Sequence, residues 1–271
     1  MRQLRQPRLA EIVAASLRDD ILTGKLKEGD SLPRQEDLFT EFRVSLPAVR
    51  EAMRILETEG LITVRRGNVG GAVVHLPTAG RTAQMISMVL QTRGATPGDV
   101  SGALSNIEPI CARMCAARED RAAEVVPALR AAIDAQQAEF DDVARYNANA
   151  RVFHETLVER CGSETMILVV GALEAIWSAH EVSVWDEKAA ADAGAATDPD
   201  APLARRTRRA ALRDHEKLLA AIEAGNAERA FSLASAHLAV TRRTTLAAAA
   251  RTTIDANLVG RGPGTAAGSG T

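Results

Sequence analysis

Aromatic side chains are scarce in this sequence, at 3% of its 271 residues, whereas alanine recurs in runs throughout the chain. A β-sandwich needs alternating Val, Ile, Tyr and Phe, so the composition favours closely packed helices. Cysteine is also rare: the three thiols are odd in number and lack the paired spacing of a zinc site. Cys111 and Cys115 lie one helical turn apart in an apolar pattern, which indicates packing rather than redox chemistry.

Long apolar runs and a large excess of one charge are absent as well. No stretch approaches the length that spans a membrane, and the N-terminal residues contain no apolar signal core. We therefore expect a cytoplasmic protein without a membrane partner. The formal net charge is −2, so any contact with nucleic acid must come from a local group of Arg and Lys side chains.

The chain divides into regions with different patterns. Short helical patterns and a strand pair fill residues 8–76, whereas residues 82–250 show one helical pattern after another. Between them, Pro and Gly interrupt the chain at 77–81, which predicts a linker. A surface loop is expected at 189–202. The end of the chain, 251–271, is rich in Gly and Ala with little to bury, so we expect a disordered tail.

The N-terminal region has the outline of a winged helix-turn-helix domain. Apolar residues at helical spacing predict three helices: the first ends at Gly24, the second opens at Pro33 and the third ends at Gly60. β-branched runs at 61–65 and 72–75, separated by a Gly-rich segment, predict a hairpin. On topology alone, a small α+β domain with no nucleic-acid role is the alternative.

Residues 17–74 resemble the GntR superfamily of bacterial transcription regulators. The family pattern combines a Gly-x-Leu turn, Pro-Gly-x-x-Leu-Pro, Val-Ser-x-x-x-Val-Arg-Glu-Ala and a Gly-containing wing, and it is met almost throughout, with Glu28 in place of the first Pro. Such a long, ordered match argues against a domain without a nucleic-acid role. The resemblance implies that the chain binds double-stranded operator DNA, as a homodimer on a pseudo-palindromic site.

A recognition helix presents short side chains and guanidinium groups where its N-terminal end enters the major groove. We expect Ser45 and the first-turn N–H groups to hold a phosphate oxygen, and Arg50 to hold another. An ion pair of Arg50 with Glu51 or Glu57 is the alternative. Arginines at the wing tip are expected to reach the minor groove. The predicted DNA contacts are Arg34, Ser45, Leu46, Pro47, Ala48, Arg50, Arg65, Arg66 and Gly67.

Two positions depart from the family pattern where many relatives carry arginines that contact bases. Glu36 and Leu46 stand there, and neither a carboxylate nor an isobutyl group can make a bidentate contact with guanine. Arg34, two residues before Glu36, is expected to take over part of that contact. The resemblance therefore implies the class of ligand but not the operator sequence.

The helical region resembles the FadR-type effector domain, the FCD domain, of the same superfamily. The resemblance rests on Ile107-Glu108-Pro109, on Phe153-His154 and on residues 214–237. It implies a mainly α architecture in which a C-terminal all-α bundle follows the DNA-binding domain. It also implies a small carboxylic acid or acyl-type effector and a site for Zn²⁺ or another divalent transition metal, with His154 as one ligand.

Two further histidines can be placed by helix geometry. His215 lies ten residues before the predicted turn at Gly225, and His237 lies twelve residues after it. In an antiparallel helix pair these distances differ by about 3 Å along the axis, so both imidazoles can point into one space. Together with His154 they form a predicted set of three metal ligands, which suits a borderline metal with an open position. One buried and one surface histidine is the alternative.

Two polar groups of the family's pocket are missing from this chain. Metal-binding relatives carry an Asp four residues before His154, where this chain has Ala150, and many carry an Arg where it has Leu104. Either the metal is held by one anionic ligand fewer, or the pocket works without an ion. The loss favours an effector with more hydrocarbon than a small hydroxy acid. The predicted effector-pocket residues are Leu104, Glu108, Asn147 and Ala150.

A metal-dependent hydrolase is the alternative from another class, because three histidines with an open position also suit a hydrolytic zinc centre. No HExxH or comparable motif places a general base beside these ligands, and a DNA-binding module precedes them. We therefore expect a regulator and not an enzyme. A regulator that responds to the metal alone is a further alternative. His180, Trp177 and Trp185 are assigned to packing.

Overall fold

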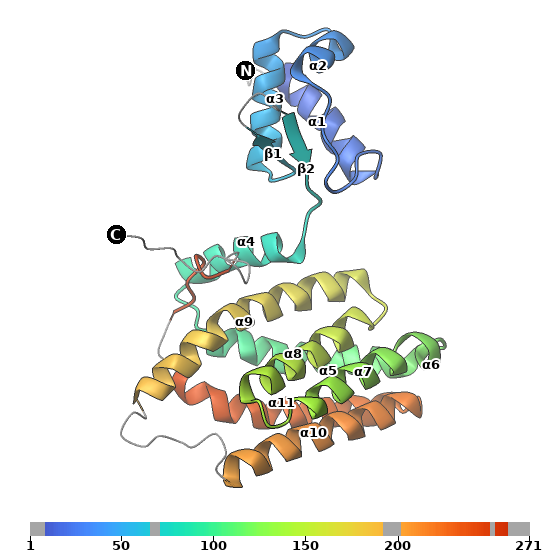
Figure 1. Cartoon of the computed structure of the whole chain (residues 1–271), viewed down its shortest axis with the longest axis vertical. Helices are drawn as coiled ribbons and strands as arrows, with labels where there is room; N and C mark the ends of the chain where they lie inside the picture. Colours follow the sequence, from blue (N-terminus) through green and yellow to red (C-terminus); the bar gives the residue numbers. More distant parts are fainter. Residues whose placement is uncertain (1–8, 66–70, 192–201, 250–252, 260–271) are drawn as a thin grey trace, which may run out of the picture. The chain divides into compact units, whose positions relative to one another are not determined.

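The computed structural model describes residues 9–65, 71–191, 202–249 and 253–259 (Figure 1). Within these ranges the chain is mainly helical with one small antiparallel sheet, which confirms the predicted fold class. Its internal contacts divide it into two compact units, residues 1–78 and 79–271. None of the described helices combines the length and the apolar character that a membrane span requires.

The N-terminal unit is a winged helix-turn-helix. Helix α1 packs against α3, and α2 packs against α3 as well. Strands β1 and β2 pair antiparallel, with Ile62 opposite Val74 and Arg65 opposite Gly71. The elements are α1 (Leu9–Leu22), α2 (Gln35–Phe42), α3 (Leu46–Thr58), β1 (Ile62–Arg65) and β2 (Gly71–Val74).

Apolar residues at helical spacing form the core of this unit. Val13, Leu17 and Ile21 of α1 are almost fully buried against Val49 and Leu56 of α3 and their neighbours. Full burial of one such side chain contributes about 1.5–3 kcal/mol. The core therefore fixes which face of α3 points inward and leaves the opposite face exposed.

Glu28, the residue that departs from the family's proline, ties the end of the hairpin to the turn after α1. Its carboxylate accepts a hydrogen bond from Nδ1 of His75 at 2.9 Å and another from the backbone N–H of Leu76 at 2.6 Å. Nε2 of His75 lies 3.0 Å from the hydroxyl of Thr63 on β1. These contacts fix the segment that leaves β2.

The second unit is an all-helical bundle around α5. Helix α5 packs against α11, α9, α8 and α10, while α7 packs against α8, and α4 packs against α9 (Figure 1). Helices α10 and α11 form an antiparallel pair joined at Gly225, which has a positive φ of 69°. The helices are α4 (Ala79–Thr92), α5 (Pro97–Ala117), α6 (Arg121–Glu124), α7 (Val126–Ala138), α8 (Val143–Glu159), α9 (Glu164–Ala191), α10 (Pro202–Glu223) and α11 (Ala227–Ala249).

Two irregular segments are shorter than the sequence predicts. Helix α4 begins at Ala79, so three residues of the linker expected at 77–81 lie in its first turn. Ala83 and Ser87 give this helix a buried face. The loop expected at 189–202 overlaps the last turn of α9 and the start of α10, and its remainder, 192–201, lies outside the described residues.

The expectation of a disordered tail is wrong for residues 253–259, which we call the C-terminal strap. Ile254 is completely buried in the core of the second unit, and Ala256 and Val259 are also buried. These apolar residues are few and stand beside a Gly-rich stretch, so the average composition of 251–271 does not indicate that any of them is buried. Residues 260–271, and Arg66 and Gly67 of the wing, lie outside the described residues.

Hydrogen bonds hold the strap to α9 and to the end of α4. His180 of α9 is buried, with Nδ1 2.8 Å from the carbonyl oxygen of Ile176, so its Nε2 is left to accept a hydrogen bond. The strap donates backbone N–H groups from Ile254 to the carbonyl of Ala95 at 3.0 Å, from Asp255 to Nε2 of His180 at 2.9 Å, and from Ala256 to Oε1 of Gln91 at 3.1 Å.

Candidate nucleic-acid interface and three-histidine site

The N-terminal end of α3 is exposed, as a DNA-reading helix requires. Ser45, Pro47 and Arg50 are exposed, while Leu46 and Ala48 are partly buried. Ser45 precedes the helix in an extended conformation, and its hydroxyl makes no capping hydrogen bond within the described part of the chain. The hydroxyl and the free N–H groups of the first turn can therefore bind an oxyanion.

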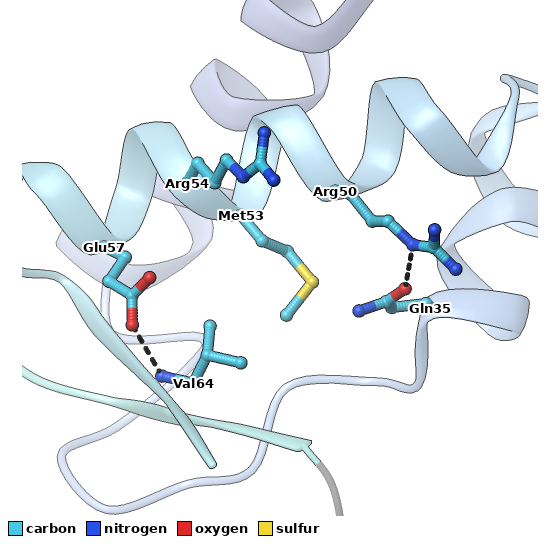
Figure 2. Close-up of a pocket in the computed structure, with 6 residues that line it drawn as sticks. All are labelled: Gln35, Arg50, Met53, Arg54, Glu57 and Val64. Carbon is cyan, nitrogen blue, oxygen red and sulfur yellow. Dashed lines mark hydrogen bonds between the residues drawn. The ribbon is translucent and has the colours of Figure 1, made fainter. Parts of the chain in front are cut away.

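Arg50 is held by a neutral partner and not by an acid. Its Nε donates to Oε1 of Gln35 at 3.2 Å, a contact that Figure 2 shows across the space between α3 and α2. The expected alternative, an ion pair of Arg50 with Glu51 or Glu57, is not formed in the described part of the chain. Glu51 instead lies 3.5 Å from Arg54. The charge of Arg50 is thus oriented but not neutralised.

A groove runs beside α3 and β1, with the side chain of Met53 pointing into it (Figure 2). The carboxylate of Glu57 accepts a hydrogen bond from the backbone N–H of Val64 at 3.1 Å, which fixes the first strand of the wing against α3. Gln35 and Arg54, which the sequence analysis missed, also line this groove. The spacing of Arg54 four residues after Arg50 could have indicated that both lie on one face.

Arg34 and Arg65, two further residues of the predicted DNA contacts, are exposed as well. Arg34 precedes α2, and its backbone N–H donates to Oδ2 of Asp37 at 3.2 Å, while the side chain is exposed. Arg65 is exposed at the end of β1. Glu36, which stands where relatives carry an arginine, is also exposed. The exposed face of this unit thus carries several guanidinium groups around the start of α3.

In the second unit, three helices bring His154, His215 and His237 together. One ring nitrogen of each lies within 4.8 Å of the others. The Nε2 atoms of His215 and His237 are 3.2 Å apart, and the rings of His154 and His237 stack with centroids 5.4 Å apart. His154 comes from α8, His215 from α10 and His237 from α11. The antiparallel pair joined at Gly225 therefore places the last two as its register predicts.

Each of these imidazoles has an oxygen partner near Nδ1. A hydrogen bond from Nδ1–H to an oxygen atom fixes the tautomer and leaves the lone pair of Nε2 to face a cation. The pairs are His154 with Glu108 at 2.5 Å, His215 with Oε1 of Gln136 at 2.8 Å, and His237 with Asp214 at 4.0 Å. The pair of His237 and Asp214 is too long for a hydrogen bond and is an electrostatic contact.

Burial keeps two of the rings neutral. It lowers the pKa of His215 well below its ordinary value, and it lowers the pKa of His237 to about 4, with the positive charge of His154 adding to both effects. His215 and His237 are 1% and 7% exposed, whereas the side chain of His154 is 20% exposed. The cluster therefore offers neutral nitrogen ligands and approaches solvent on the His154 side.

The predicted effector residues fall into two groups. Glu108 is buried beside His154, and Leu104 is buried one helical turn earlier on α5. Ala150, on α8, is partly buried one turn before His154. Asn147 is not brought to the cluster, since its side chain is exposed. Its neighbour Asn149 donates to the carbonyl of Ala135 at 3.1 Å.

Glu174 of α9 is a polar residue that the sequence analysis missed. It is 9% exposed, and its Oε1 atom is buried without a hydrogen-bond partner among the described residues. Burial raises the pKa of Glu174 to about 8, and the negative charge of Glu108 adds to the rise. The sequence could have indicated this residue, because Glu174 is the one charged residue in the apolar run from Met166 to Trp177.

Two family models match the chain. The model described as "Bacterial regulatory proteins, gntR family" matches residues 9–73, which cover the winged helix-turn-helix. The model described as "FCD domain" matches residues 99–240, which is more than half of the chain and includes all three histidines. The two matches confirm the resemblances of the N-terminal region to the GntR superfamily and of the helical region to the FCD domain.

Curated relatives include the HTH-type transcriptional repressor NanR of Klebsiella aerogenes, which is 27% identical over 167 residues. That alignment covers 60% of this chain and 62% of the repressor, so the chain spans less than two thirds of the relative's length. The HTH-type transcriptional regulator Mce2R of Mycobacterium tuberculosis is 42% identical over 59 residues, which are 22% of this chain and 25% of the relative.

A solved structure described as Streptococcus agalactiae GntR has a similar fold, with a TM-score of 0.62. The superposition covers 87% of this chain and 99% of that one, at 18% sequence identity. At this identity the likeness concerns the fold and not the ligand.

Proposed function

Since the chain belongs to the gntR family of bacterial regulatory proteins and carries an FCD domain, we propose that it is a DNA-binding transcription regulator controlled by a small ligand. The winged helix-turn-helix unit binds operator DNA, and the helical unit binds the effector. The names of the relatives from Klebsiella aerogenes and Mycobacterium tuberculosis, a transcriptional repressor and a transcriptional regulator, support this assignment.

In this proposal the N-terminal end of α3 enters the major groove. Ser45 and the first-turn N–H groups bind one phosphate, and Arg50, oriented by Gln35, binds another. Arg65 continues the basic surface onto the wing. One such domain contributes few base contacts, so we propose that two copies bind a pseudo-palindromic operator as a homodimer.

The three-histidine cluster fits a divalent transition metal such as Zn²⁺. Its ring nitrogens lie within 4.8 Å of one another, burial keeps His215 and His237 neutral, and oxygen partners at Nδ1 orient the rings. These are the properties that metal-binding imidazoles share in proteins. A metal bound there would supply an open, Lewis-acidic position for an oxygen atom of the effector.

The chemistry of the neighbouring residues supports a carboxylic acid or acyl-type effector. A carboxylate oxygen is a suitable partner for a borderline metal held by three imidazoles. Leu104 and Ala150 stand where the family resemblance implies an arginine and an aspartate, so the same surroundings can also accept hydrocarbon. The effector therefore combines one oxygen-bearing head group with an apolar part.

The observation that carries this proposal is the convergence of His154, His215 and His237, with their oxygen partners, inside the span of the FCD domain. The test begins with DNA recovered by the purified, tag-free protein from a random pool. Release of that DNA is then measured with Zn²⁺ alone, with carboxylic acids of increasing chain length alone, and with both together. Release that requires an acid supports the proposal.

Release by Zn²⁺ alone would instead identify a regulator that responds only to the metal. Failure to recover any DNA with salt-dependent binding would overturn the assignment as a regulator. A turnover assay with simple esters tests the hydrolase alternative on the same preparation, and we expect no turnover.

A further inference from the structure

We propose that Glu174 supplies the negative charge that the three-histidine site lacks at position 150, by contacting the bound metal ion or a water molecule that the ion holds. This inference rests on the proposed metal site. It concerns a residue of α9, a helix that contributes none of the three histidines. The family resemblance gives the acidic ligand to the position of Ala150, so it assigns no role to Glu174.

The burial of Glu174 is the first observation. Its side chain is 9% exposed, and Oε1 has neither solvent contact nor a hydrogen-bond partner among the described residues. A buried carboxylate is normally paired with a cation or bound to a metal, because removing it from water is costly. A purely structural role would be filled better by an apolar side chain, as at its neighbours Leu173 and Ala175.

The charges around Glu174 are the second observation. Glu108, Glu155 and Glu159 all raise the pKa of Glu174, and His154 is the group that lowers it. Burial and these acidic groups therefore favour the protonated form of Glu174 when no ion is bound. A divalent cation beside His154 would favour its ionised form instead, since opposite charges attract.

The packing of the helices is the third observation. Helix α9 packs against both α5 and α8, which carry Glu108 and His154. Glu174 thus lies on a helix packed against the two helices that carry Glu108 and His154, whereas Ala150 lies one turn before His154 on α8 itself. The chain has lost an acid at one position near the site and buries an acid at another. We infer that the second compensates for the first.

The experiment measures metal affinity on the tag-free, full-length protein by competition with a chromophoric chelator for Zn²⁺. Glu174→Gln keeps the shape of the side chain and removes its charge, and it should weaken Zn²⁺ binding by about 10- to 100-fold, the usual effect of losing a group that supports a metal site. Glu155→Gln and Glu159→Gln are matched controls, because both acids raise the pKa of Glu174 but occupy more exposed positions. They should weaken binding less than Glu174→Gln.

A spectroscopic readout separates a contact with the ion from a role in folding. The visible absorption of bound Co²⁺ depends on its ligands, so Glu174→Gln should change that spectrum, whereas the control variants should not. The thermal unfolding midpoint of metal-free Glu174→Gln should equal or exceed that of the wild type, since the variant buries no carboxylate. Adding Ala150→Asp to Glu174→Gln should restore much of the lost affinity.

Two outcomes overturn the inference in different ways. If the wild type binds Zn²⁺ and Glu174→Gln binds it equally tightly with an unchanged Co²⁺ spectrum, Glu174 has no role at the ion and the proposed function stands. If the wild type itself binds no metal, the metal site of the proposed function fails and the role of Glu174 fails with it.

Discussion

The two units of this chain place their polar residues in opposite ways. In the N-terminal unit, the residues proposed to bind DNA are exposed, and Arg50 is oriented by a neutral amide that leaves its charge available. In the helical unit, His215 and His237 are buried and His154 is partly buried, and hydrogen bonds at Nδ1 hold His154 and His215. An exposed cation attracts a polyanion over a long range, whereas a buried cluster selects a small ligand at short range.

The strap gives the largest expected effect on the stability of the helical unit. Ile254 is fully buried, so Ile254→Ala should lower the free energy of unfolding of that unit by about 2–5 kcal/mol. Urea denaturation measures this change. Val240→Ala is the control, because Val240 is 60% exposed and its loss should change stability by less than about 0.5 kcal/mol. Equal effects of both substitutions would mean that the strap is not part of the core.

Removal of one buried imidazole should abolish metal binding by the helical unit and leave DNA binding by the N-terminal unit unchanged. His215→Ala and His237→Ala should each weaken Zn²⁺ binding by more than about 100-fold, since even groups that only orient metal ligands contribute about 10- to 100-fold. Metal analysis should then fall from near one ion per chain to near zero. DNA binding without effector should be retained, because the proposed contacts to DNA lie in the other unit. Unchanged metal content in both variants would contradict the proposed site.

Loss of an exposed charge should have a smaller effect, confined to DNA. Arg50→Ala should weaken binding to operator and random duplex alike, roughly tenfold, as expected for one hydrogen bond to a charged group. It should also reduce the slope of log affinity against log salt by about one unit. Arg145→Ala removes the same charge from the helical unit and serves as the control in the same anisotropy titrations. A sequence-dependent loss would show that Arg50 reads a base instead.

The smallest effect is expected at the end of the wing. Glu28 accepts hydrogen bonds from His75 and Leu76, but its side chain is half exposed, so solvent screens these contacts. Glu28→Ala should lower the stability of the N-terminal unit by at most about 1 kcal/mol. Glu28→Pro would restore the family's residue without the carboxylate, and thermal unfolding of both variants checks whether the hydrogen bonds or the backbone shape matter more.

Much of this architecture could be predicted from the sequence because it depends on local rules. Helix periodicity and the turn at Gly225 were enough to place His215 opposite His237, since residues at equal distances from a turn meet in an antiparallel pair. The order of helices and hairpin in the first unit follows from apolar spacing in the same way. Such predictions succeed where the partner lies nearby in the sequence.

Other features depend on contacts between distant segments and could not be predicted from local patterns in the sequence. Ile254 is one of a few apolar residues beside a Gly-rich stretch, and it is buried in a core built by helices distant in the sequence. Glu174 is one acid in an apolar run, and its raised pKa depends on burial and on charged residues of other helices. The partner of Arg50 is Gln35 on another helix, whereas the alternative considered from the sequence was an acid on α3 itself.

The most direct test of the central claim is one set of anisotropy titrations on recovered operator DNA, with the wild type and His215→Ala. Each chain is titrated with and without Zn²⁺ plus the carboxylic acid that releases the wild type most strongly. We predict that both chains bind DNA with the same salt dependence, and that the acid weakens binding at least tenfold for the wild type and leaves His215→Ala unchanged. Equal release of both chains, or no salt-dependent binding by either, would contradict the account.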